Sequence, residues 1–395
     1  MTDLLTTPIT ARLVRGCLEL EETEDGLLPH RLPVRARAQN TDPQLATAEA
    51  QPSGVRLALR TRATRIELQT RPTKRVYAGF PPRPDGVYEL VVDGHQTAHG
   101  AVTGGNTMTT DVQTGSVTTN PGPAGSVAFK GLSDEVKDIE IWLPHDEQTE
   151  LIALRTDAPV EPVLPDDKRQ WLHHGSSISH GSNATNPTGT WPAIAAASVG
   201  VELYNLGLGG GALLDPFIAR VLRDTAADVI SVKLGINLVN TDLMRLRAFG
   251  PAVHGWLDTV REGHPDTPLI VVSPILCPIH EHTPGPSAVD TDAFAKGRVE
   301  FIASGDVADV PAGKLTLSTV RTELTRIVEQ RSTTDAHLHY IDGRDLYGEA
   351  DAAVLPLPDR LHPDAVTHRL IAERFAALAF ETEDAPFAAQ AATRR

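Results

Sequence analysis

Four short motifs in this chain carry residue types that could together cleave an ester. They are Gly175-Ser176-Ser177, Gly207-Leu208-Gly209-Gly210-Gly211, Leu234-Gly235-Ile236-Asn237 and Asp359-Arg360-Leu361-His362-Pro363. A serine at a strand-to-helix corner offers its hydroxyl to a base, and an aspartate three residues before a histidine can orient that base. Glycine N–H groups and an asparagine amide can donate to a developing oxyanion. Each motif alone is typical of a turn, but their order predicts a serine hydrolase.

The motifs follow apolar segments that we expect to be strands. Continuous apolar strands that alternate with helices indicate a parallel sheet covered on both faces. Such a sheet gathers its functional residues at the carboxyl ends of its strands, and the motifs fall there. The predicted strands are 170–173, 201–205, 229–234, 269–273 and 337–341, and the predicted helices are 191–199, 213–225, 243–262, 314–330 and 365–379.

The first 160 residues have a different pattern. Apolar and polar residues alternate there at period two, and clusters of Gly, Pro, Asn and Asp separate the alternating segments 55–62, 65–71, 86–92 and 137–144. Many short strands of this kind predict an antiparallel β-sandwich of jelly-roll type. We therefore expect a β-sandwich domain over 1–160, a linker over 161–167 that belongs to a proline-rich stretch, and a catalytic α/β domain over 168–395.

The order of the four motifs resembles that of the SGNH/GDSL hydrolase superfamily over roughly residues 168–380. The resemblance implies a flavodoxin-like α/β/α fold in which Ser177 is the nucleophile. It also implies that His362 and Asp359 complete a catalytic triad. The oxyanion hole would consist of the Ser177 N–H, Gly210 and Asn237.

Three details of the motifs bear on this assignment. Gly209 is a close rival of Gly210 as the oxyanion glycine. Ser176 stands where the superfamily's common Gly-Asp-Ser has aspartate, and Leu238 stands where its Gly-x-Asn-Asp has aspartate. Both positions would support the reacting residues, so we expect activity to be retained. Some two-domain members resemble a jelly roll followed by the catalytic domain, among them carbohydrate esterases and acyl-transferring tailoring enzymes.

The reaction that this resemblance implies is ester cleavage through an acyl-enzyme, with an acetyl or short acyl group on a sugar or small molecule. One alternative is an acyltransferase that uses the same triad with a small-molecule or natural-product alcohol in place of water. Another is an inactive relative that binds a glycan. No metal or organic cofactor is expected.

Composition bears on partners and location. A formal net charge of −15 argues against nucleic acid and anionic membranes as partners. The two cysteines, Cys17 and Cys277, lie far apart, so a disulfide framework is not expected and a reducing compartment fits. No secretion signal or apolar run of about 18 residues is evident, so we expect a cytoplasmic protein.

Two further features lie between the third and fourth motifs. His280-Glu281-His282 looks like a pair of metal ligands, but no third ligand is evident, so we expect no metal there. The segment 278–305 is long, polar and interrupted by Pro and Gly, which makes it a candidate lid or acyl-pocket wall.

Overall fold

The computed structural model describes residues 4–79, 83–111, 114, 116–163, 168–382 and 384–388. The chain divides into two compact units. Unit 1 contains Met1–Asp167 and Thr185–Thr188, and unit 2 contains Lys168–Ala184 and Gly189–Arg395.

Unit 1 consists mainly of two β-sheets, and every strand pair is antiparallel except β6 with β9. The first sheet has the order β10 (Val117–Asn120), β9 (Asn106–Thr110), β6 (Arg65–Tyr77), β13 (Gln148–Thr156), β4 (Leu27–His30) and β3 (Glu19–Glu22), with β1 (Leu5–Thr7) on β13 and β11 (Gly125–Lys130) on β6. The second has the order β14 (Val160–Pro162), β5 (Arg56–Thr61), β12 (Lys137–Trp142), β7 (Val87–Val92) and β8 (His95–Ala101), with β2 (Val14–Arg15) on β5.

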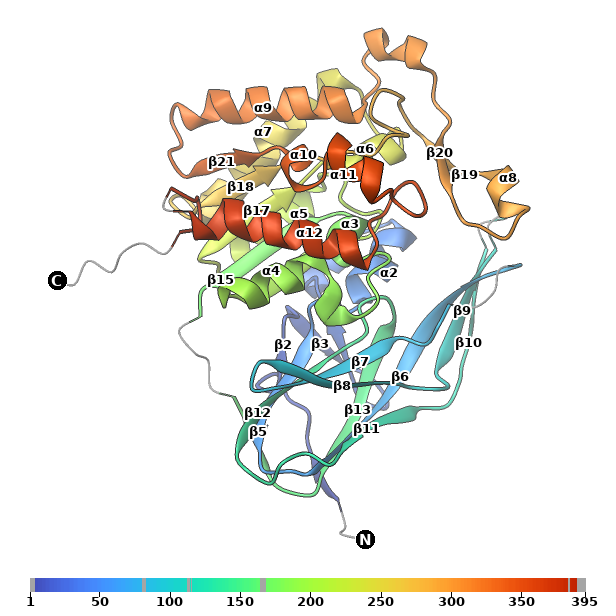
Figure 1. Ribbon diagram of the computed structural model, residues 1–395, viewed down its shortest axis with the longest axis vertical. Coiled ribbons are helices and arrows are strands. Elements are labelled where there is room, and N and C mark those ends of the chain that lie inside the picture. Colours follow the sequence, from blue (N-terminus) through green and yellow to red (C-terminus); the bar gives the residue numbers. More distant parts are fainter. Residues whose placement is uncertain are drawn as a thin grey trace, which may run out of the picture. The chain divides into compact units, whose positions relative to one another are not determined.

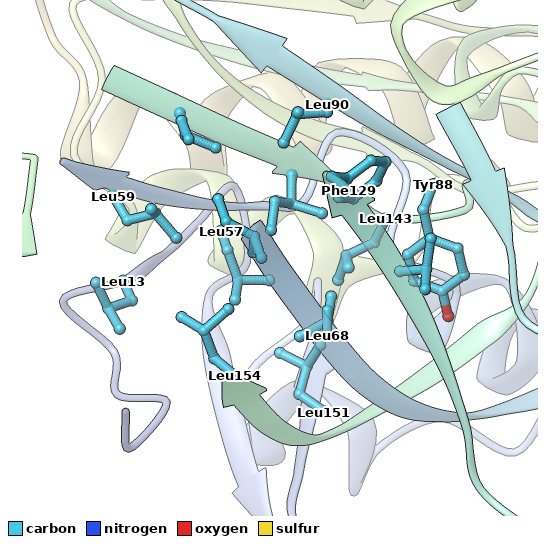
Figure 2. Packing of buried hydrophobic residues seen from close by; sticks show 14 of the residues in the cluster. Leu13, Leu57, Leu59, Leu68, Tyr88, Leu90, Phe129, Leu143, Leu151 and Leu154 are labelled. Atoms are coloured by element: carbon cyan, nitrogen blue, oxygen red, sulfur yellow. The ribbon is translucent and has the colours of Figure 1, made fainter. Parts of the chain in front are cut away.

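The two sheets share one apolar core. Along β6 every second side chain from Ile66 to Thr70 is buried, as expected for a strand with one face against a core. Leu68 and Leu154 of the first sheet belong to the same buried cluster as Leu57 of the second, and Figure 2 shows these side chains gathered between the strands. The antiparallel sandwich expected from the sequence is confirmed.

Two short helices and one edge strand complete unit 1. Helices α1 (Val34–Arg37) and α2 (Pro43–Ala50) lie between β4 and β5. Strand β14, Val160–Pro162, falls at the start of the expected linker and pairs with β5 at the edge of the second sheet. An edge strand tolerates proline because its outer N–H groups need no partner in the sheet. Residues 164–167 of the expected linker lie outside the described residues.

Unit 2 contains a five-stranded parallel sheet. Its order is β16 (Glu202–Gly207), β15 (Gln170–Gly175), β17 (Val229–Lys233), β18 (Leu269–Val272) and β21 (Leu338–Ile341). Numbered along the chain, this is the order 2-1-3-4-5 of flavodoxin-like folds. The α/β prediction is therefore confirmed.

Helices pack on the sheet of unit 2, as the ribbon in Figure 1 shows. Successive residues of β15 point to opposite faces. Trp171 contacts Trp191 of α4 and Phe375 of α12, whereas His174 stacks on Trp256 of α7. The main helices are α4 (Trp191–Val199), α5 (Pro216–Asp224), α7 (Leu246–Gly263), α9 (Leu317–Ser332) and α12 (Ala365–Ala376).

Shorter elements fill the connections of the chain. They are α3 (Ser177–His180), η1 (Pro187–Gly189), α6 (Ile236–Asn240), β19 (Ser287–Val289), α8 (Thr291–Phe294), β20 (Phe301–Ala303), η2 (Val307–Ala312), α10 (Gly343–Leu346), α11 (Glu349–Val354) and η3 (Ala377–Glu381). Strands β19 and β20 pair with each other in a small separate sheet. In the described part of the chain, none of the helices combines the length and the apolar composition that a membrane-spanning segment needs.

The shared core of unit 1 makes its stability sensitive to single large residues. Leu68→Ala should lower the free energy of unfolding by about 2–5 kcal/mol, because a fully buried leucine leaves a cavity when it is truncated. Urea denaturation followed by circular dichroism measures this. Val117→Ala, at a position 53% exposed, is the control and should change stability little. Equal losses in both variants would contradict the shared core.

Candidate active site

Ser177 is the first residue of helix α3, which begins directly after strand β15. Ser176 is the N-cap of this helix, and its Oγ accepts a hydrogen bond from the Ile178 N–H at 3.4 Å. The helix ends at Gly181, whose φ of 111° is left-handed. Ser176, which replaces the aspartate of the resemblance, therefore acts on the backbone of the helix, and the next residue presents its hydroxyl at the strand-to-helix corner.

Helix α3 lies directly on the end of the neighbouring strand. Gly207 of β16 leaves room for it, since a Cβ added there would lie 2.4 Å from the His180 backbone nitrogen. The Asn205 side chain donates from Nδ2 to the Ser179 carbonyl (2.9 Å) and accepts from the Gly207 N–H (2.8 Å). His173 Nε2 lies 2.8 Å from Ser179 Oγ. These contacts, all buried, set the position of the whole helix.

His362 connects the serine to a carboxylate. Its Nε2 lies 2.9 Å from Ser177 Oγ, and its Nδ1 lies 2.8 Å from Asp359 Oδ2. An ionised carboxylate only accepts hydrogen bonds, so Nδ1 carries the proton in the neutral ring. The lone pair of Nε2 is then directed at the serine hydroxyl, as a general base requires.

The carboxylate of Asp359 accepts four hydrogen bonds. Oδ1 accepts from the backbone N–H groups of Leu361 and His362, at 2.9 and 2.6 Å. Oδ2 accepts from the His362 ring and from Asn183 Nδ2 at 3.1 Å. Burial alone would raise the pKa of this carboxyl, but the hydrogen bonds and the charge of His362 outweigh it and hold the pKa below its usual value. Asp359 is therefore ionised at neutral pH.

The Gly-rich turn after β16 lies between Ser177 and Asn237. A Cβ added at Gly209 would lie 3.8 Å from Ser177 Cβ, and the Ala212 N–H donates to Asn237 Oδ1 at 3.1 Å. That bond uses the carbonyl end of the amide, so its NH₂ end is directed elsewhere. The Gly209 N–H donates to Nδ1 of His180 at 3.3 Å. Because this N–H already has an acceptor, the geometry favours Gly210 as the oxyanion glycine.

Three donors on these elements make no hydrogen bond to any described residue. They are the Ser177 N–H, the Gly210 N–H and Asn237 Nδ2. Gly210 has a φ of +77° in its turn, a conformation that glycine adopts readily. Unused donors beside a serine hydroxyl are what stabilisation of an oxyanion requires.

The other histidines near the serine have different partners. His173 and His174 are fully buried in β15, where His173 Nδ1 lies 2.7 Å from Ser231 Oγ and His174 Nδ1 lies 2.9 Å from the Leu206 carbonyl. Burial, together with the charges of neighbouring groups, lowers the pKa of His173 well below its usual value. His173 therefore contributes as a neutral hydrogen-bonding group of the sheet.

The His280-Glu281-His282 motif makes contacts with protein groups. Both ring nitrogens of His280 lie near oxygens of its own loop, at 3.1 and 2.6 Å. Glu281 pairs with Arg321 at 2.6 Å. In the described part of the chain, no group of three or more His, Cys, Asp or Glu side chains could hold a metal ion.

Lys233 ends strand β17, four residues before Asn237. Its side chain is buried, and its Nζ has no hydrogen-bond partner among the described residues. Burial and then the nearby charge of Arg321 lower its pKa from 10.5 to about 7. A lysine in this state costs the folded protein stability because its charged form is excluded from the interior.

Two asparagines whose hydrogen bonds position the site were not predicted from the sequence. Asn205 is the polar residue within an apolar strand, and such a residue often has a hydrogen-bonding role. Asn183 lies in a polar loop, where no spacing indicates its contact with Asp359. Its φ of +64° brings it into a conformation that asparagine tolerates better than most residues.

Two family models match parts of the chain. Residues 168–279 match the model of the GDSL-like Lipase/Acylhydrolase family, and residues 13–152 match the model of the SsfX3 N-terminal domain. The chain therefore contains a GDSL-like domain preceded by a domain similar to the SsfX3 N-terminal domain. No curated protein matches it.

Several solved structures are similar over most of the chain. The salicylyl-acyltransferase SsfX3 from a tetracycline biosynthetic pathway is 26% identical with a TM-score of 0.76, over 94% of this chain and 95% of that one. A family two carbohydrate esterase from Clostridium thermocellum is 15% identical (TM-score 0.53, 82% and 90% covered). The acetyl xylan esterase Est2A from Butyrivibrio proteoclasticus is 10% identical (TM-score 0.53, 94% and 96% covered). The two esterases share the fold.

The state of Lys233 predicts how stability depends on pH. Between about 7 and 10.5 the unfolded chain binds a proton that the folded protein lacks, so this lysine makes stability rise with pH. Lys233→Met should therefore raise the urea midpoint near neutral pH, and the gain should shrink towards about pH 10. The exposed Lys296→Met is the matched control and should show no such dependence. A gain that stays constant with pH would contradict a neutral Lys233.

Proposed function

We propose that this protein is a serine esterase that forms an acyl-enzyme on Ser177. His362 takes the proton of the Ser177 hydroxyl as its oxygen attacks the ester carbonyl, and then gives that proton to the departing alcohol. The oxyanion accepts hydrogen bonds from the N–H groups of Ser177 and Gly210 and from the Asn237 amide. Water, activated by the same histidine, then releases the acid. Asp359 holds the ring in the tautomer that accepts the proton.

One observation carries this proposal. The hydroxyl of Ser177, the ring of His362 and the carboxylate of Asp359 are joined in sequence by hydrogen bonds of 2.9 and 2.8 Å. This continuous chain also argues against the alternative of an inactive glycan-binding relative, because such a protein has no need of an ionised carboxylate aligned through a ring to a hydroxyl. The substrate we propose is an acetyl or short acyl ester of a sugar or small molecule.

Acyl transfer is the second candidate, and a specific observation favours it. The similar structure with 26% identity over 94% of this chain is described as an acyltransferase. Transfer uses the same acyl-enzyme, with an alcohol in place of water as the second acceptor. The two reactions therefore differ in which acceptor reaches the ester bond on Ser177.

Ser177→Ala should reduce turnover of p-nitrophenyl acyl esters by on the order of a million-fold, because the nucleophile is lost. The adjacent Ser176→Ala is the matched control. It removes a helix cap at a cost of about 1 kcal/mol in stability and should keep most of the turnover. Steady-state kinetics on folded variants measures both. An active Ser177→Ala protein beside an inactive Ser176→Ala protein would refute the assignment.

Asn237→Ala should lower kcat by about a hundred- to a thousand-fold, as expected for one oxyanion donor. KM should change little, because the donor acts on charge that exists only in the transition state. Asn240→Ala, one turn further along α6, serves as the control and should be nearly unchanged. A large rise in KM at constant kcat would instead identify Asn237 as a residue that binds the ground state.

A further inference from the structure

A β-hairpin lies after the third motif in the chain and contacts the loop that carries Asp359 and His362. We call residues 287–303 the arm, since they comprise β19, α8 and β20, and Figure 1 shows these elements set apart from the parallel sheet of unit 2. Strands β19 and β20 pair antiparallel, from Ser287 with Ala303 to Val289 with Phe301. The arm lies within the segment that the sequence suggested as a lid or acyl-pocket wall.

The arm is attached to the loop that carries Asp359 and His362. The Phe301 N–H donates to the Asp359 carbonyl at 3.0 Å. Arg360, between the two proposed triad residues, pairs through Nη2 with Glu300 at 2.7 Å, and the Glu300 side chain is only 8% exposed. The same guanidinium reaches Asp290 at 3.4 Å. The loop that positions the acid and the base therefore also positions the arm.

The backbone of Arg360 adopts an unusual conformation at this attachment. Its φ of +67° lies in the left-handed region, which few residues other than glycine adopt without strain. Its carbonyl accepts from Cys277 Sγ at 3.4 Å, while its side chain pairs with the arm. The strained turn and the ion pairs together hold the arm at one end of the loop.

This attachment brings an aromatic ring against the proposed base. The rings of Phe301 and His362 have centroids 5.8 Å apart and an interplanar angle of 77°, an edge-to-face contact. Phe301 is half-buried, so the residue is not fully enclosed by the protein.

The proposed chemistry of His362 indicates which part of the ester lies near His362 and Phe301. In deacylation the acceptor oxygen attacks the acyl carbon, and Nε2 takes its proton as the new bond forms. The tetrahedral intermediate then collapses, the bond from the acyl carbon to Ser177 Oγ breaks, and Nε2 returns the proton to Ser177. The acceptor must therefore lie within hydrogen-bonding reach of His362, whereas the oxyanion lies towards Gly210 and Asn237.

We propose that Phe301 is a specificity-determining residue that forms a wall of the alcohol subsite, and that the Arg360–Glu300 ion pair holds it there. This inference rests on the proposed acyl-enzyme at Ser177. The alcohol it favours has an apolar or aromatic face that packs on the Phe301 ring. The arm thus biases the competition between water and alcohol for the acyl-enzyme.

The test measures how one acyl-enzyme partitions between two acceptors. The enzyme is acetylated with p-nitrophenyl acetate in the presence of benzyl alcohol, and the ratio of benzyl acetate to acetate is measured. This ratio depends only on deacylation. Phe301→Ala should lower it by about three- to tenfold, the usual range for loss of an aromatic contact. With methanol, which is too small to pack on the ring, the ratio should change less than about twofold.

Matched variants separate the ring from its surroundings. The hydrogen bond from the Phe301 N–H to the Asp359 carbonyl involves backbone atoms, so side-chain variants should leave it in place. Phe301→Tyr should retain the wild-type ratio, because it keeps the aromatic ring. Phe294→Ala removes another phenylalanine of the arm, in α8 and 38% exposed, and should leave the ratio unchanged.

A second pair of variants tests the ion pair. Glu300→Gln should lower the benzyl ratio in the same direction as Phe301→Ala. Arg298→Gln removes the other cation paired with Glu300, at 2.6 Å, and leaves the bond to Arg360 intact, so it should have no effect. Equal effects of Glu300→Gln and Arg298→Gln would refute the holding role of Arg360.

The outcomes distinguish this inference from the function on which it rests. If an acetyl-enzyme forms on Ser177 but Phe301→Ala leaves the benzyl ratio unchanged, the alcohol wall is refuted and the esterase proposal stands. An absence of benzyl acetate from the wild-type protein would refute the wall as well. If no acetyl-enzyme forms on Ser177, the proposed function fails and the wall fails with it.

Discussion

The proposed chemistry depends on how the four-residue helix α3 is held against the end of the parallel sheet. Gly207 permits the close approach, and Asn205 and His173 bind Ser179 within the helix. Because these contacts are buried, the position of Ser177 is set by groups that do not take part in the reaction. A shift of about 1 Å in this helix would separate the hydroxyl from its base, and such displacements can cost about a hundred-fold in rate.

The proposed base, His362, is positioned by a different kind of structure. Asp359 and His362 lie on one short loop, where two backbone N–H groups, Asn183 and the imidazole all donate to the same carboxylate. The loop also holds the arm through Arg360, so the proposed acid–base residues and the residue that would contact the alcohol share one support. A change in the arm can thus alter the choice of acceptor without removing any reacting group.

Much of the fold followed from the sequence, because continuous apolar runs and alternating segments indicate different kinds of sheet. Strand β14 did not, since the three prolines of residues 156–165 are typical of a linker and only pairing at a sheet edge accommodates the strand. The residues proposed to react were chosen from their motifs, and the structure joins Ser177, His362 and Asp359 by hydrogen bonds. The contact of Asn183 with Asp359 was not, because it joins positions 176 residues apart that only the folded chain brings together. Likewise, nothing in the sequence indicates that Phe301 meets His362.

The proposed function requires that Ser177 becomes covalently acylated because His362 removes its proton. The most direct measurement is peptide mass spectrometry after treatment with a fluorophosphonate, which forms a stable adduct with an activated serine. One adduct per chain is expected, on Ser177, and it should be lost when His362 is replaced by alanine. An adduct on Ser176, or labelling of Ser177 that is as rapid without His362 as with it, would contradict the proposed function.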